Sequence, residues 1–188
     1  MKLRKVRRQR LSKRKLRELV LYISRGSEGD VFFGAVKLNK LLFLADFFAY
    51  RTYGRSITGA EHEKLEHGPA PRKLKPLLQW MERRKLIAVR PIELGGYTQK
   101  RTLALREPDL SKFSAEEIAL VDHLIRRFWD RSASEMSDIS HRLRGWQLAK
   151  VGEIIPYSVA LVGNRDPTER ERTYGLRLEA EARACLAL

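Results

Sequence analysis

The side chains most suited to chemistry are four histidines and one cysteine. His62 and His67 bracket the segment HEKLEH and are five residues apart. A helical metalloprotease site needs two histidines four residues apart, because that spacing puts both rings on one face. His141 has serines and an aspartate nearby but no other feature of a nucleophile site, and Cys185 has no catalytic residues around it. We therefore expect no bound metal and no cofactor.

The motifs of several common enzyme classes are also absent. The chain contains no GxSxG elbow, no GxxxxGK[ST] loop and no GxGxxG turn, which are typical of acyl transfer, nucleotide hydrolysis and dinucleotide binding. A single cysteine excludes a disulfide framework within the chain and is compatible with a reducing cytoplasm, the location we expect. We predict a binding protein and not an enzyme.

Positive charge is concentrated at the beginning of the chain. The net charge is +15, and residues 1–17 hold ten cations and no acid, which leaves +5 for residues 18–188. Such a block is either a solvated tail or a contact to the phosphates of DNA or RNA. It has no aromatic residue on which a base could stack. The candidate nucleic-acid contacts are Arg4, Lys5, Arg7, Arg8, Arg10, Lys13 and Arg14.

No segment predicts membrane insertion or secretion. The most apolar run, Leu38 to Tyr50, contains Lys40 and Asp46 and is shorter than the ~20 residues of a spanning helix. Residues 1–18 alternate cations with single apolar residues and therefore lack the apolar centre of a secretory leader.

Most of the periodic pattern is helical. Apolar residues recur at three- and four-residue steps, and Gly54 and a capping box from Ser114 mark helix ends. The predicted helices cover residues 11–25, 34–53, 72–85, a stretch that begins at Ser114, and Ser132 to Leu143, with Ser134 as a candidate N-cap. The helix at 34–53 is apolar over too broad an arc for a surface helix, so we expect it to be central.

Extended structure is predicted in fewer places. Residues 87–94 and 98–105 flank Gly95-Gly96 and predict a β-hairpin, while residues 56–67 lead to a bend at Gly68-Pro69. Residues 145–162 are predicted as loop and turn. The fold class is thus mainly α with a small β-hairpin (α+β). We expect a basic arm at 1–14, a compact helical domain at 15–165 and a C-terminal helix at 166–188.

Two stretches, residues 37–74 and 132–149, resemble the Panacea domain (SocA-like antitoxin) family. In the first, the matching residues are Lys37, Leu38, Lys40, Leu41, Leu42, Phe43, Tyr53, Gly54, Arg55, Glu66, His67, Gly68 and Pro69. In the second they are Ser137, Ser140, His141 and Trp146. Met136 and Gly145 depart from the family pattern, which has leucine and proline there. The resemblance covers about residues 15–162.

This resemblance implies an antitoxin that neutralises a toxin encoded nearby through direct protein contact, with at least one family member acting as a proteolytic adaptor. It brings no catalytic residue. We expect structural roles for the motif residues Lys37, Leu38, Lys40, Leu41, Tyr53, Gly54, Gly68, Pro69 and Ser137. The two lysines are expected to snorkel from a core helix towards solvent.

Two functional interpretations follow. In the first, Trp146, Tyr157 and His141 contact the partner protein, because large aromatic side chains are common anchors of interfaces. In the alternative, the helix at 72–85 and the hairpin at 87–105 act as a winged-helix-like nucleic-acid-binding unit or transcriptional regulator, with the arm on phosphate.

Overall fold

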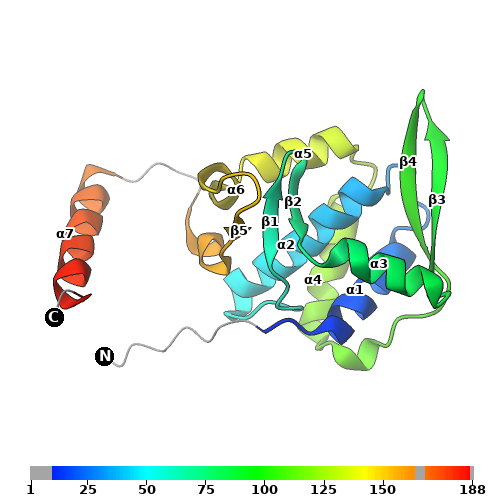
Figure 1. The fold of residues 1–188 in the computed structure, drawn as a ribbon, viewed down its shortest axis with the longest axis horizontal. Coiled ribbons are helices and arrows are strands. Elements are labelled where there is room, and N and C mark those ends of the chain that lie inside the picture. Colours follow the sequence, from blue (N-terminus) through cyan, green and yellow to red (C-terminus); the bar gives the residue numbers. More distant parts are fainter. Residues whose placement is uncertain (1–9, 164–167, 187–188) are drawn as a thin grey trace.

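A computed structural model of the chain describes residues 10–163 and 168–186. Helix α2 (Ala35–Tyr53) lies at the centre, as predicted, and buries most of its length. Helices α1 (Lys13–Gly26) and α4 (Ala115–Arg127) pack against it (Figure 1). The chain is mainly helical with a small β part, which confirms the predicted fold class.

Side-chain caps fix the starts of several helices. Ser114 and Glu117 form the predicted capping box of α4. Helix α5 (Ala133–His141) begins with a second capping box, made by Ser132 and Glu135, so the N-cap is Ser132 and not Ser134. In each box a serine oxygen accepts from one free backbone N–H, and the glutamate accepts from another. At the other end of α2, Gly54 adopts the left-handed conformation of a helix terminus (φ +70°).

A three-stranded antiparallel sheet was not predicted. Strand β1 (His62–Leu65) pairs with β2 (Gly68–Pro71) on one side and with β5 (Ile154–Ile155) on the other. The register pairs Leu65 with Gly68, so the chain reverses at residues 66–67. The prediction of a bend at Gly68-Pro69 was therefore wrong by two residues, since both belong to the returning strand.

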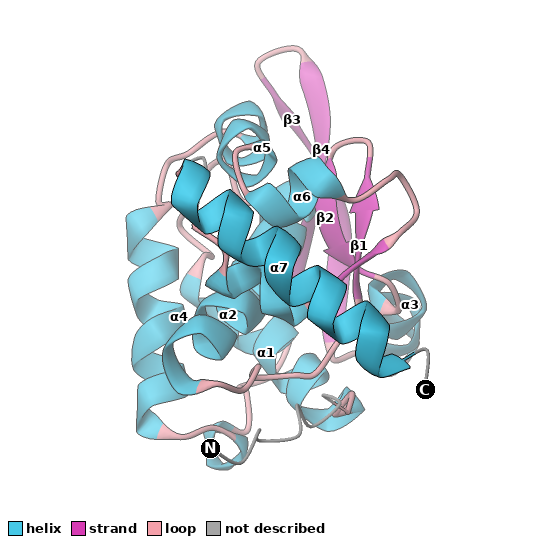
Figure 2. Ribbon diagram, turned by 90° about the vertical axis from the view of Figure 1, so that its left-hand side faces the viewer, coloured by secondary structure: helices cyan, strands magenta, loops and turns pink. Residues whose placement is uncertain are grey.

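The predicted hairpin is present and forms a separate two-stranded sheet. Strands β3 (Ile87–Leu94) and β4 (Tyr97–Ala104) pair along their whole length around Gly95 and Gly96, which both have positive φ. Helix α3 (Leu74–Arg83) precedes this hairpin, but the β1–β2 hairpin and not a second helix comes before α3. Figure 2 shows strands β1 to β4 on one side of α2 and α4.

The segment predicted as loop at 145–162 contains more secondary structure than expected. It contains the short helix α6 (Arg144–Leu148), strand β5 and the 3-10 helix η2 (Tyr157–Leu161). A further 3-10 turn, η1 (Leu110–Lys112), precedes α4. Helix α7 (Glu169–Leu186) confirms the expected helix near the C-terminus, and its described side chains are exposed. Across the described ranges no helix is long and apolar enough to span a membrane.

Candidate functional site

The two motif stretches meet at one backbone carbonyl. Lys40 on α2 donates its ammonium to the carbonyl oxygen of His67, in the turn between β1 and β2. Ser137 on α5 donates its hydroxyl to the same oxygen at 3.3 Å. The central helix, the β1–β2 turn and α5 are thereby joined at a single atom, although 97 residues separate Lys40 from Ser137 along the chain.

Gly68 is required at this junction. Its φ is +104°, a conformation that L side chains rarely adopt. A Cβ atom at this position would overlap the ammonium of Lys40 and lie 2.8 Å from the hydroxyl of Ser140. Both the backbone and the available space therefore restrict position 68 to glycine.

Both motif lysines are buried, so the expectation that they snorkel was wrong. Lys37 is 1 % exposed, and its ammonium contacts Asp30 Oδ2 at 2.5 Å and the carbonyl of Arg131 at 2.9 Å. Lys40 is 2 % exposed. Each head group finds oxygen acceptors inside the fold, and a buried charge needs such partners to be tolerated.

Burial lowers the pKa of Lys40 to about 8, and this predicts a rise of stability in mild alkali. Between pH 8 and 10 the unfolded chain holds a proton on Lys40 that the folded chain has released, so the free energy of unfolding increases with pH. We expect an increase of about 2 kcal/mol across this range. Urea denaturation at pH 8, 9 and 10 measures it.

Lys40→Met is the control for this pH prediction. It should remove the rise, because no titrating group then stands at position 40. Above pH 10 stability should fall again, since burial raises the pKa of Tyr157 and of Tyr22, and only the unfolded chain then loses those protons. A wild type whose stability is flat or falls from pH 8 to 10 would contradict the prediction.

The predicted contact residues His141 and Trp146 stack on one another. Their ring centroids are 3.8 Å apart with an interplanar angle of 17°, and the ammonium of Lys64 lies 3.9 Å from the Trp146 ring centroid. Burial and then the nearby charge of Lys40 lower the pKa of His141, which favours the neutral ring. Trp146 lies in helix α6, is half-buried and packs against the hydrophobic core.

Tyr157 belongs to a buried polar network centred on Asp46 of α2. The two oxygens of Asp46 accept from the backbone N–H and the hydroxyl of Thr58, at 2.7 and 2.5 Å. His62 Nε2 lies 2.9 Å from Asp46 Oδ2. The Tyr157 hydroxyl donates to the Ala60 carbonyl at 2.5 Å, and its ring stacks on Tyr50. This network holds η2 against α2.

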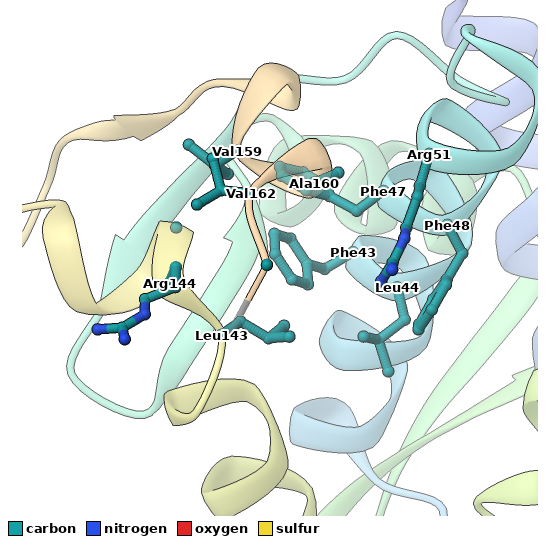
Figure 3. A pocket seen from close by; sticks show the side chains of 12 residues that line it. Phe43, Leu44, Phe47, Phe48, Arg51, Leu143, Arg144, Val159, Ala160 and Val162 are labelled. Carbon is teal, nitrogen blue, oxygen red and sulfur yellow. The ribbon is translucent and has the colours of Figure 1, made fainter. Parts of the chain in front are cut away.

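An open pocket of about 290 Å³ lies between α2 and the segment 143–163. Figure 3 shows Phe43 of α2 facing Val159 and Val162 across it, with Leu143 at its lower edge. Gly145 borders the same pocket, and a Cβ there would overlap Val159. The departure from proline at position 145 thus coincides with close packing of α6 on η2.

The structure separates the two histidines of the HEKLEH segment. His62 is fully buried and packs edge-on against the rings of Phe43 and Phe47, whereas His67 is exposed in the β1–β2 turn. Within residues 10–163 and 168–186, no group of three or more His, Cys, Asp or Glu side chains is placed to hold a metal ion.

Part of the basic arm can be placed. Arg4, Lys5, Arg7 and Arg8 lie outside the described residues. Arg10 and Lys13 are exposed, and Arg14 lies 3.5 Å from Asp109.

Three of the remaining motif residues are buried, and Tyr53 is partly exposed. Leu38 and Leu41 are core residues, and Pro69 is buried in β2. Tyr53 is partly exposed at the end of α2, with its hydroxyl 3.5 Å from the Glu116 carbonyl.

Sequence reasoning missed Asp46 and Lys64. A carboxylate inside the most apolar helix of the chain was a usable signal for Asp46, because a buried charge requires partners. Lys64 gave no comparable signal, since a lysine in a short strand is ordinary.

Comparison with known proteins gives one family. No curated protein and no solved structure matches the chain. Residues 38–147 match the family described as Antitoxin SocA-like, Panacea domain. This range includes Lys40, the β1–β2 turn, Ser137 and Trp146, whose contacts join the two motifs. The chain therefore belongs to the SocA-like antitoxin, Panacea domain family.

Proposed function

We propose that this protein is the antitoxin of a toxin–antitoxin pair, acts in the cytoplasm and neutralises its cognate toxin by direct protein contact. Membership of the SocA-like antitoxin family over residues 38–147 carries the proposal. In this role the chain itself performs no catalysis. The Lys40–His67–Ser137 junction then serves to hold the contact surface in place, since it joins the elements that carry α6.

We place the toxin contact on the segment 143–163. Exposed large apolar side chains are concentrated there, and interface cores are richer in such residues than the rest of a surface. These residues are Leu148, Val151, Ile154, Leu161 and Val162. Leu148 is 72 % exposed and Leu161 is 64 % exposed. The adjoining pocket can receive an apolar side chain of the partner.

The three predicted contact residues have different parts in this proposal. Trp146, which is half-buried, contacts the toxin next to Leu148 on the same helix. His141 supports Trp146 from behind by stacking. Tyr157 fixes the position of η2 through its contacts with Ala60 and Tyr50.

Co-expression with the product of the adjacent gene tests the proposal. The wild-type chain should restore growth, and Leu161→Glu should abolish rescue because it puts a charge into the apolar contact. Leu105→Glu is the matched control, since Leu105 is 55 % exposed outside this segment. Trp146→Ala should weaken rescue while the variant keeps its helical circular dichroism and stays soluble.

Each other outcome has a definite meaning. If no adjacent product is toxic or bound, the antitoxin proposal fails. If Leu161→Glu and Leu105→Glu rescue equally, the contact lies on another surface. An unfolded Trp146→Ala variant would assign Trp146 to the core. Toxin that disappears during rescue indicates delivery to a protease, whereas toxin at an unchanged level indicates occlusion.

A further inference from the structure

A second pocket, of about 670 Å³, lies between the start of α1 and the first turns of α3. Figure 1 shows these two helices next to each other below the β3–β4 hairpin. The pocket is lined by Leu11, Lys13, Arg14, Leu16, Arg17, Lys73, Pro76, Leu77 and Trp80. We call it the α1–α3 groove. It has an aliphatic and aromatic floor and a rim of four cations, and none of its lining residues is an acid.

The cations of the rim are only partly neutralised. Arg17 pairs with the buried Glu18 at 2.6 Å, and Arg14 has a long contact of 3.5 Å to Asp109. Lys13 and Lys73 are exposed and lie at the first turn of α1 and just before α3. Because helix N-termini carry partial positive charge, both helices add to the positive potential of the groove.

The groove also supplies what the basic arm lacks. Residues 1–17 hold ten cations but no aromatic residue, so they can contact phosphates and cannot stack on bases. Trp80 of α3 lines the groove directly beside the end of the arm, and the guanidinium of Arg84 lies 5.4 Å from its ring centroid. Cations along the rim and an aromatic ring in the floor are the usual combination in grooves that bind single strands.

We infer that the α1–α3 groove binds single-stranded nucleic acid, with phosphates on Lys13, Arg14 and Lys73, and with a base against Trp80. Duplex nucleic acid fits less well, since its stacked bases cannot enter an apolar groove. This site is separate from the segment 143–163, so it adds to the proposed toxin contact and does not depend on it.

Fluorescence anisotropy with a labelled twenty-nucleotide oligo-dT tests the inference on the full-length chain. Lys13→Glu/Lys73→Glu should weaken binding at low salt and reduce the slope of log K against log salt by about 1.4 or more, because two phosphate contacts are lost. Trp80→Ala should weaken binding about fivefold or more through loss of stacking, whereas Trp80→Phe should retain most of the affinity. The phenylalanine variant also guards against loss of fold, since Trp80 packs partly on the core.

Two controls make the inference falsifiable. Arg90→Glu/Lys100→Glu makes the same change of charge on exposed positions of the β3–β4 hairpin and should change the affinity by less than the groove variant does. If it weakens binding as much, the hairpin and not the groove holds the strand. A labelled twenty-residue poly-glutamate that binds as tightly as oligo-dT would assign the groove to acidic polypeptides. Equal binding by Trp80→Ala and wild type, or no binding of oligo-dT at low salt, would also overturn the inference.

Discussion

Gly68→Ala should lower the free energy of unfolding by about 3 kcal/mol or more. Two costs add at this position. The backbone has φ +104°, which alanine adopts only with strain, and the new methyl group would overlap the ammonium of Lys40. Lys40 is buried and bound to the His67 carbonyl, so it cannot move away without leaving a charge without its acceptor.

Gly54→Ala is the matched control for this prediction. Gly54 also has a positive φ, +70°, but nothing lies within 4 Å of a Cβ built there. It should cost about 1–2 kcal/mol, which is the backbone strain alone. Urea denaturation of both variants measures the difference. If Gly68→Ala costs no more than Gly54→Ala, the close packing around Lys40 does not constrain the fold.

Asp46→Ala should cost about 3–5 kcal/mol, because it removes the acceptor at the centre of a buried network. Thr58 would lose the partner of both its backbone N–H and its hydroxyl, and His62 would lose the contact of its Nε2. Each buried polar group without a partner is costly, since water is not available to replace the lost hydrogen bond.

Asp46→Asn and Tyr157→Phe separate the contributions in this network. Asparagine keeps the shape and one acceptor oxygen, so it should cost less than alanine. Tyr157→Phe removes one hydroxyl, bound to Ala60, and should cost about 1 kcal/mol. Thermal and urea unfolding of the three variants gives the ranking. Equal stabilities of Asp46→Ala and wild type would show that this network does not hold η2 and α2 together.

Most helices and the β3–β4 hairpin were predictable because the sequence signals that specify them are local. The apolar arc of α2, the capping box of α4 and the glycine pair between β3 and β4 all lie within a few residues of the structure that they specify. The start of α5 shows that such local signals can be ambiguous. It and Ser134 are both plausible N-caps, and Glu135 three residues after Ser132 completes a capping box.

The β2–β1–β5 sheet was not predictable from local pattern. Strand β5 has two residues, and it pairs with β1 about ninety residues earlier in the chain. Such short strands carry no alternation of apolar and polar residues long enough to recognise. Because the chain reverses two residues earlier than predicted, Gly68 and Pro69 belong to strand β2 and not to the turn.

The candidate site was predictable by resemblance and not by physical reasoning from the residues. The resemblance grouped the motif residues, but the contacts of its two lysines use backbone carbonyls, of His67 and Arg131, that no sequence pattern reveals. Two lysines in a core helix therefore suggested snorkelling. Trp146 was expected in a loop, but it lies in α6, a helix of five residues that is too short to show an apolar repeat.

Hydrogen–deuterium exchange of the purified chain, alone and bound to the product of the adjacent gene, tests the proposed toxin contact most directly. If the toxin contact lies on the segment 143–163, amides of α6 and η2 should exchange more slowly in the complex. Helix α3 and the start of α1 should be unchanged in the absence of nucleic acid. Protection confined to α1, α3 or the β3–β4 hairpin, with α6 and η2 unchanged, would contradict it.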